Sequence, residues 1–334
     1  MTIVVTDARI KTLLHTPTRV SLRPRYEGSN ICTWIGFKHD NYLVEEAVLE
    51  HFRAAGLSSR VLYEELGLGL DFAELDVRIL SSLHLDDLVT ADVEPVSKDG
   101  DALLFRVTLN VDRDGASVKA VTGRARVVLR IDTTFPAEPV PEPLRPFAVE
   151  RIATSEPGAH VTPAASEPLS DGHGTTGPDP VLSLLTEGKN AFGWKWRIPY
   201  PYCHFTERLQ MSGYLRQMEE VVDLFLADRG LSIKTLLDDR KWIPACSHSK
   251  IRILDEALME EDLYVVYTVE EIFKDFLYRS RFDTYVVREG RLVQTATGQV
   301  THGYAVIDSR TDWHLVNFDE PVLRALRGEP AIGA

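Results

Sequence analysis

One helix-like segment occurs twice in this sequence. Residues 44–58 read VEEAVLEHFRAAGLS, and residues 218–232 read MEEVVDLFLADRGLS. Glu219 follows Glu45 by 174 positions, and each begins an adjacent pair of glutamates near the start of its segment. An internal repeat of this kind decides the architecture of the whole chain. We therefore predict two copies of one fold.

The correspondence extends on both sides of this segment. Upstream, the same spacing takes Asn30 to His204. Beyond Leu85 the spacing changes by one residue, and the matched pairs become Asp87-Leu88 with Asp262-Leu263 and Thr122-Gly123 with Thr297-Gly298. A match that persists over about a hundred residues with single slips indicates duplication rather than chance.

Each copy has the same predicted order of elements. The repeated helix has apolar residues on most of its faces, which is typical of a buried helix. Segments with period-two alternation follow it and are joined by tight turns such as KDGD, DRDG and REGR. One buried helix with several antiparallel strands predicts an α+β fold in which each sheet wraps around its helix. We expect the copies to occupy residues 1–132 and 191–310.

The region between the copies has a different composition. It begins with the proline-rich run TTFPAEPVPEPLRPF and continues with many Ser, Gly and Pro residues. Few large apolar residues and no clear periodicity predict a linker over residues 133–190. Residues 311–334 are predicted to be a C-terminal tail.

Bulk properties restrict the partners. The 334 residues carry a formal net charge of −13, which disfavours nucleic acid as a partner. No apolar run is long enough to span a bilayer, and the first residues lack a secretory signal, so we expect a cytoplasmic protein without membrane association. Three cysteines without paired spacing argue against a disulfide framework or a zinc ribbon. We expect neither a metal nor a bound cofactor.

The pattern of one helix and a wrapped antiparallel sheet resembles the hotdog fold, and the tandem pair resembles a double hotdog. The second copy is similar to acyl-carrier-protein thioesterases, through a run that includes Arg208-Leu209, Glu219, Gly230 and Trp242. This resemblance implies an enzyme that hydrolyses acyl thioesters.

The first copy resembles small thioesterases of enediyne polyketide pathways, which have a Glu-x-Thr-Asn loop before the helix. Here the loop reads Glu27-Gly28-Ser29-Asn30. The usual catalytic aspartate of 4-hydroxybenzoyl-coenzyme-A thioesterases is replaced by Asn30 in this copy and by His204 in the other. The departure leaves open whether either copy retains chemistry.

A competing resemblance is to fatty-acid dehydratases of the same fold. His204, Phe205, Met211, Gly213 and Glu219 have nearly the spacing of the dehydratase motif, although its prolines are absent and the acid is one residue late. This resemblance implies loss of water from a 3-hydroxyacyl thioester.

In a paired hotdog, the loop before one helix faces the helix of the other copy. This geometry, which the resemblance implies, gives two candidate clefts: His204 with Glu45 or Glu46, and Asn30 with Glu219 or Glu220. A histidine can exchange protons near neutral pH, which favours the first cleft. The second would use Asn30 to orient water or the carbonyl.

Other residues near these clefts also have expected roles. We expect Gly213, Tyr214 and Phe205 to bind substrate, with helix-terminal amides near Gly213 and Tyr214 polarising the carbonyl and Gly213 admitting the acyl chain. His39-Asp40 could cap the helix that follows or touch substrate, and a cap is the default expectation. Cys203 is expected to be an apolar filler, and we expect Cys246 and His248 to share a strand face without forming a catalytic pair.

These resemblances together imply an acyl thioesterase acting on acyl-coenzyme A or an acyl carrier protein, within a polyketide or fatty-acyl pathway. A dehydratase or hydratase on a 3-hydroxyacyl thioester is the first alternative. A non-catalytic acyl-binding partner is the second. Because two hotdogs in one chain already complete the minimal pair, both monomer and homodimer remain compatible with the sequence.

Overall fold

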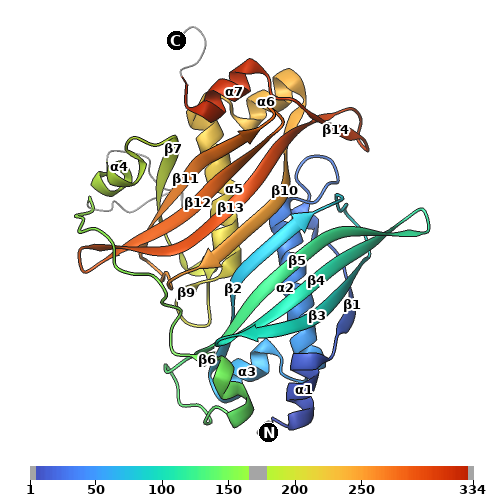
Figure 1. Cartoon of the computed structure of the whole chain (residues 1–334), viewed down its shortest axis with the longest axis vertical. Helices are drawn as coiled ribbons and strands as arrows, with labels where there is room; N and C mark the ends of the chain where they lie inside the picture. The colour runs from blue at the N-terminus through green and yellow to red at the C-terminus, as the bar shows by residue number, and fades with distance from the viewer. Residues whose placement is uncertain (1–4, 165–178, 330–334) are drawn as a thin grey trace. The chain divides into compact units, whose positions relative to one another are not determined.

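The computed structural model describes residues 5–164 and 179–329, and Figure 1 shows its helices and strands. The chain forms two compact units that divide between Ile152 and Ala153. This division lies inside the region predicted as a linker. Among the helices of the described ranges, none is long and apolar enough to cross a membrane.

The N-terminal unit contains an antiparallel sheet in the order β1-β3-β4-β5-β2, and β6 adds to β5 in parallel. Its elements are α1 (Asp7–His15), β1 (Thr18–Leu22), η1 (Tyr26–Gly28), α2 (Phe37–Ala54), α3 (Ser59–Leu66), β2 (Leu68–Ile79), β3 (Val89–Asp99), β4 (Ala102–Arg113), β5 (Ala116–Ile131), η2 (Glu142–Phe147) and β6 (Ala148–Val149).

The C-terminal unit repeats this arrangement with an antiparallel sheet in the order β7-β11-β12-β13-β10, and β14 pairs with β13. Its elements are α4 (Pro180–Thr186), β7 (Ala191–Arg197), η3 (Tyr200–Tyr202), β8 (Cys203–His204), β9 (Arg208–Leu209), α5 (Met211–Asp228), α6 (Ile233–Arg240), β10 (Trp242–Ile253), β11 (Asp262–Phe273), β12 (Leu277–Arg288), β13 (Arg291–Ile307), β14 (Trp313–Val316) and α7 (Glu320–Arg327).

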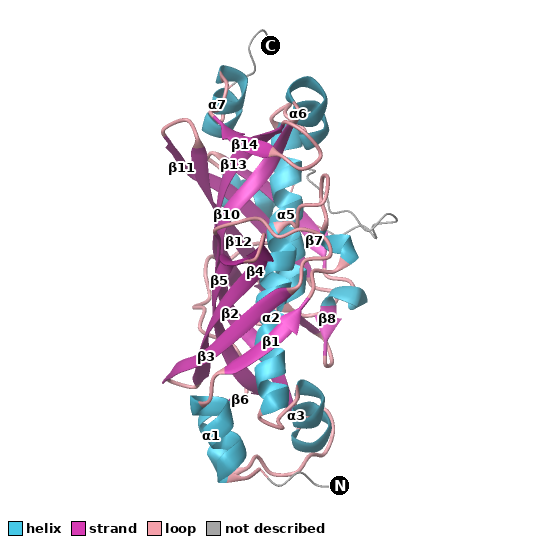
Figure 2. Ribbon diagram, turned by 90° about the vertical axis from the view of Figure 1, so that its right-hand side faces the viewer, coloured by secondary structure: helices cyan, strands magenta, loops and turns pink. Residues whose placement is uncertain are grey.

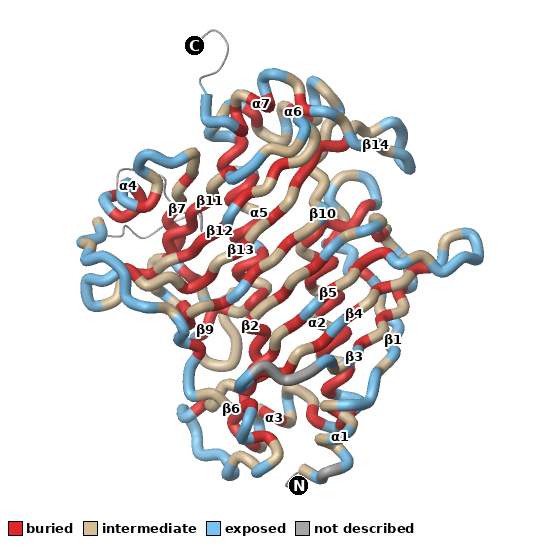
Figure 3. The backbone as a smooth tube through the Cα atoms, viewed as in Figure 1, coloured by how far each residue is buried: buried red, intermediate tan, exposed pale blue. Residues whose placement is uncertain are grey.

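In each unit the long helix, α2 or α5, lies along one face of its own sheet (Figure 2). The strands alternate between buried and less buried residues, as Figure 3 shows, because successive side chains point to opposite faces. A glycine on the sheet allows close approach in both units. A Cβ atom added at Gly123 would lie 2.9 Å from Val44 Cγ1, and one at Gly298 would lie 2.7 Å from Met218 Cε.

These two contacts are equivalent under the predicted duplication, since Met218 occupies the position of Val44. The α+β tandem hotdog predicted from the sequence is therefore the observed fold: each antiparallel sheet packs on one buried helix.

Short stretches of the predicted linker are packed rather than extended. Leu144 and Phe147 of η2 are buried in the N-terminal unit. Helix α4 is capped by Asp179 and buries Val181 and Leu182 in a cluster that includes Tyr264 of β11. These short apolar segments were not predicted, because the apolar content averaged over residues 133–190 is low. Residues 165–178 of the predicted linker lie outside the described residues.

The predicted C-terminal tail also contains packed structure. Strand β14 pairs with β13, and α7 buries Val322 and Leu326 completely. The helix is capped by Asp319, whose side chain accepts a hydrogen bond from the amide of Val322.

The short helix after each central helix ends with a left-handed residue, and the two copies differ there. Gly67 (φ 61°) ends α3, whereas Lys241 (φ 55°) ends α6. A side chain at such a conformation costs about 1 kcal/mol relative to glycine. We expect Lys241→Gly to raise the free energy of unfolding by about that amount in urea denaturation. Lys241→Ala, which keeps a Cβ atom, is the control, and an equal gain in that variant would contradict the explanation.

Candidate active site

The loop that carries His204 is a small hairpin directly before α5. Strands β8 and β9 pair so that His204 lies opposite Arg208. His204 is half-buried, and its ring centroid lies 4.6 Å from that of Phe205. The amide of Gln210, the residue before α5, donates to the Tyr202 carbonyl at 3.1 Å and closes the hairpin against the helix start. The fold therefore holds His204 beside the first turn of α5.

The same loop geometry occurs before α2. The amide of Gly36 donates to the Gly28 carbonyl at 2.9 Å, and Ser29 forms a bridge with Ile35. The Asn30 amide donates to the Trp34 carbonyl at 3.1 Å. Asn30 and His204 therefore occupy equivalent positions in the two units, as the duplication predicted.

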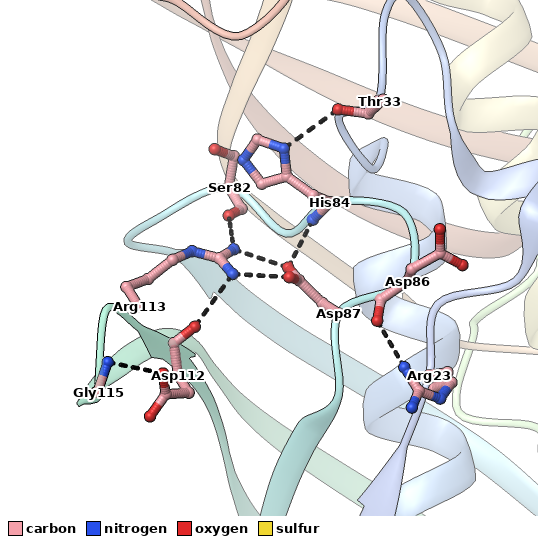
Figure 4. Close-up of polar contacts among 9 residues, drawn as sticks. All are labelled: Arg23, Thr33, Ser82, His84, Asp86, Asp87, Asp112, Arg113 and Gly115. Atoms are coloured by element: carbon pink, nitrogen blue, oxygen red, sulfur yellow. Dashed lines mark hydrogen bonds and ion pairs between the residues drawn. The ribbon is translucent and has the colours of Figure 1, made fainter.

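A salt bridge supports the loop in the N-terminal unit (Figure 4). Arg113 binds both carboxylate oxygens of Asp87, at 2.6 and 2.7 Å. Asp87 also accepts a hydrogen bond from the His84 amide at 2.7 Å. His84 in turn contacts Thr33 of the loop through its ring and pairs with Trp34 in a backbone bridge. This Arg–acid pair fixes the strand connection on which the Asn30 loop rests.

The C-terminal unit repeats the Arg–acid pair with other residues. Arg288 binds both carboxylate oxygens of Glu261 at 2.7 Å, and Glu261 accepts from the Leu258 amide at 2.8 Å. The amide of Leu209 donates to the Ala257 carbonyl at 2.8 Å, which ties the His204 hairpin to this connection. The Arg–acid pair is thus a duplicated device for positioning the loop before each central helix.

This repetition corrects one detail of the sequence comparison. Asp87 corresponds to Glu261, not to Asp262, so the one-residue slip comes after the acid rather than after Leu85. The sequence contained the signal, because Arg113 and Arg288 are related by the same slipped spacing as Gly123 and Gly298.

The electrostatics of Asp87 agree with a supporting role. Partial burial alone favours its neutral form, but hydrogen bonds from Arg113 and from the His84 amide favour the carboxylate and hold the pKa of Asp87 below its usual value. The carboxylate therefore stays ionised and paired at neutral pH.

The adjacent glutamates of α2 have different environments. Glu45 is half-buried, and desolvation together with the charge of Glu46 raises its pKa to about 8. Glu46 instead forms a surface ion pair with Arg53 at 2.7 Å, and Arg53 also contacts Glu50. Of the two, Glu45 is thus the one whose environment suits proton transfer.

Glu219 and Glu220 are both half-buried on α5, about two helical turns after the helix begins at Met211. The pairing of His204 with Glu45 or Glu46, and that of Asn30 with Glu219 or Glu220, stay predictions.

The expected cap of the first helix is wrong. Helix α2 begins after Gly36, so His39 and Asp40 lie inside its first turn and are buried. A Cβ atom at Gly28 would lie 2.8 Å from the His39 ring, which shows that His39 packs under the Asn30 loop. Asp40 is only 1% exposed, and burial raises its pKa well above the usual value.

The burial of Asp40 predicts a pH-dependent stability. When folding raises the pKa of a carboxyl, protonation of that carboxyl stabilises the folded state. This contribution is complete below the pKa of the unfolded state and is lost as the pH rises toward the pKa of the folded state. Relative to Asp40→Asn, the wild type should lose about 1.4 kcal/mol of unfolding free energy per pH unit from about pH 4 upward, until the folded pKa is reached. Urea denaturation of both proteins across this range measures the difference. A constant difference would contradict it.

The expected roles of Gly213 and Tyr214 are not supported. The amides of both residues donate to the Gln210 carbonyl, at 2.9 and 3.3 Å, so they are not available to a thioester carbonyl. A Cβ atom at Gly213 would lie 2.5 Å from Leu209 Cδ1, so β9, rather than an acyl chain, occupies the space beside it. The amides that helix geometry leaves without an acceptor inside α5 are those of Met211 and Ser212.

The side chain of Tyr214 is fully buried between α5 and the sheet, where its hydroxyl faces Thr295. Phe205 lies in the hairpin turn with a φ of 55°, and the Arg208 guanidinium lies 5.5 Å from its ring centroid. Phe205 thus remains beside His204, and its contact with substrate stays a prediction.

The environment of Cys203 is unfavourable for a nucleophile. Burial, followed by the nearby charge of Glu207, raises the pKa of Cys203 to about 11, which disfavours a nucleophilic thiolate. The prediction that Cys246 and His248 share a strand face is wrong. Cys246 lies opposite His302 and His248 opposite Thr301, with a bulge between them, so their side chains point to opposite faces. Within the two described ranges, no cluster of three or more metal-ligating side chains occurs.

Several solved structures have a similar fold. A protein described as an oleoyl thioesterase from Lactobacillus plantarum is 13% identical, with a TM-score of 0.56 over 86% of this chain and 96% of that chain. The 12:0-ACP thioesterase from Umbellularia californica is 11% identical, with a TM-score of 0.54 over 90% and 98% of the two chains.

An acyl-ACP thioesterase from Bacteroides thetaiotaomicron is 10% identical, with a TM-score of 0.50 over 86% of this chain and 97% of that one. No protein-family model matches the sequence, and no curated protein matches it significantly. At these identities the similarity establishes the double-hotdog fold.

Proposed function

We propose that this protein hydrolyses an acyl thioester carried by coenzyme A or by an acyl carrier protein. The observation that carries the proposal is the equivalence of the two loops that precede the central helices. His204 of one loop occupies the position that Asn30 occupies in the other. The structures of similar fold that act on acyl thioesters support the same class of substrate. The substrate brings its own pantetheine arm, so the reaction needs no further cofactor.

In the proposed mechanism, His204 accepts a proton from water as the water oxygen bonds to the thioester carbonyl carbon. Glu45, protonated at neutral pH by virtue of its raised pKa, donates a hydrogen bond to the oxygen on which negative charge develops. The tetrahedral intermediate then collapses, the carbon–sulfur bond breaks, and the proton held by His204 passes to the departing thiolate. The products are a free acid and a free thiol.

The proposal assigns chemistry to one of two pseudo-equivalent clefts. Asn30 cannot accept a proton at neutral pH, so the Asn30 side of the duplication would depend on Glu219 or Glu220 for acid–base chemistry. If Asn30→Ala removes activity and His204→Ala leaves it intact, the assignment of the cleft is reversed.

A panel of acyl-coenzyme-A and acyl-carrier-protein thioesters tests the reaction itself. We expect release of free thiol, measured with a thiol-reactive dye, in equimolar amounts with free acid. Loss of water from a 3-hydroxyacyl substrate without thiol release would instead favour the dehydratase alternative. Tight acyl binding with neither product would favour a non-catalytic acyl-binding protein, and either result would overturn the proposal.

A further inference from the structure

Gln217, on α5, is a buried polar residue that the proposed mechanism does not use. Its side chain has no exposed surface, and neither its Nε2 donor nor its Oε1 acceptor has a hydrogen-bond partner among residues 5–164 and 179–329. An amide left in this state costs free energy, so its retention calls for an explanation such as a bound water or a catalytic role.

The duplication shows that the fold itself does not require an amide at this position. Leu43 of α2 is equivalent to Gln217 by the 174-residue spacing, and it is 6% exposed. An apolar side chain therefore fills the same place in the other copy. The glutamine is specific to the unit that carries His204.

The helix geometry directs Gln217 toward the His204 hairpin. Residues four apart share a helix face, and long side chains point back toward the N-terminus, so the amide of Gln217 extends toward Gly213. Leu209 of β9 and the Tyr202 carbonyl cover this face at Gly213. Strand β9 leads directly into the first turn of α5 (Figure 1). The unpartnered amide thus lies beside the loop that holds the proposed base.

We propose that Gln217 binds a water molecule and positions it for attack on the thioester carbonyl, an inference that rests on the proposed hydrolysis. Water offers two hydrogens and two lone pairs. Gln217 Oε1 accepts one hydrogen, and Nε2–H donates to one lone pair. The remaining hydrogen is then directed to His204, and the remaining lone pair forms the bond to the carbonyl carbon. Gln217 is a positioning residue and exchanges no proton.

Gln217→Leu tests this assignment, because it installs the residue found at the equivalent position. We expect kcat for thiol release to fall about tenfold, the contribution of one hydrogen bond, while KM and the melting temperature do not fall. Gln217→Glu, whose neutral form offers one donor and one acceptor to the same water, should retain a larger fraction of the wild-type activity at acidic than at alkaline pH. Leu43→Met, a volume-conserving change at the equivalent position, is the matched control.

Three outcomes would overturn the inference. An unchanged kcat in Gln217→Leu would show that the amide does not act in hydrolysis, and a fall in both kcat and melting temperature would show that it holds the fold. A crystal structure of the wild type provides a test that does not depend on activity: we expect a water about 3 Å from both Nε2 and Oε1. Absence of that water would overturn the inference, whereas absence of thiol release by the wild type would overturn the proposed function.

Discussion

His204→Ala should lower kcat/KM for thiol release by about 10³- to 10⁴-fold, the upper part of the range for loss of a general base. The reason is positional, since the β8–β9 hairpin holds the imidazole at the start of α5 and no other histidine lies in that hairpin. The melting temperature should change little, because His204 is only half-buried. Steady-state thiol release and thermal denaturation of the same preparation measure both quantities.

His314→Ala is the control for this substitution. His314 lies on β14, is exposed, and pairs with Asp308, so its loss should leave kcat/KM unchanged. Wild-type activity in His204→Ala would remove the histidine from the mechanism. Equal losses in both variants would indicate a general effect on folding rather than a role for His204.

Glu45→Gln should lower kcat/KM by about 10- to 100-fold, because the amide N–H is a weaker hydrogen-bond donor to the developing oxyanion than the O–H of a carboxylic acid. The pH dependence is the sharper readout. With a pKa of about 8, the Glu45 carboxyl is protonated at neutral pH and loses its proton above about pH 8. The wild-type rate should therefore fall as the pH rises through this value, and the variant should lack that decline.

The neighbouring acids provide matched controls. Glu46 and Glu50 both pair with Arg53 at the surface, so Glu46→Gln and Glu50→Gln should change the rate by less than about threefold. A wild-type rate that rises through pH 8 would contradict the proposed role, because it would require the ionised form of Glu45.

The duplication and the periodicity of the sequence were sufficient to predict the main features of the fold. The spacing of 174 residues correctly placed both central helices and equated Asn30 with His204. The later matches of Gly123 and Gly298 correspond to real contacts with the helices. These features were predictable because they depend on local patterns and on comparison of two copies.

Other features depended on single-residue events that periodicity does not record. One extra residue in β10 turns Cys246 and His248 to opposite faces, which alternation alone could not predict. Helix α2 begins at Phe37, two residues before His39. His39 and Asp40 are therefore buried inside its first turn, although the sequence predicted that they cap the start of the helix. The low average apolar content of residues 133–190 gave no indication of the short helix α4, whose burial depends on contacts with β11.

The candidate site was only partly predictable. The glutamate pairs were visible, but the difference between Glu45 and Glu46 depends on Arg53, which lies two turns further along the helix. Gln217 could not be predicted from the sequence, because a polar residue in a helix is ordinarily exposed and only its burial without hydrogen-bond partners makes it unusual.

A double-mutant cycle tests the central claim most directly, namely that His204 acts as base and Glu45 as hydrogen-bond donor in the proposed thioester hydrolysis. kcat/KM for thiol release would be measured for the wild type, His204→Ala, Glu45→Gln and the double variant. A general base and an oxyanion donor contribute separately to one transition state, so their losses should multiply. We predict that each single variant is slower than the wild type and that the double variant is the slowest, near the product of the two losses. A wild-type rate in either single variant, or a double variant no slower than His204→Ala, would contradict these two roles.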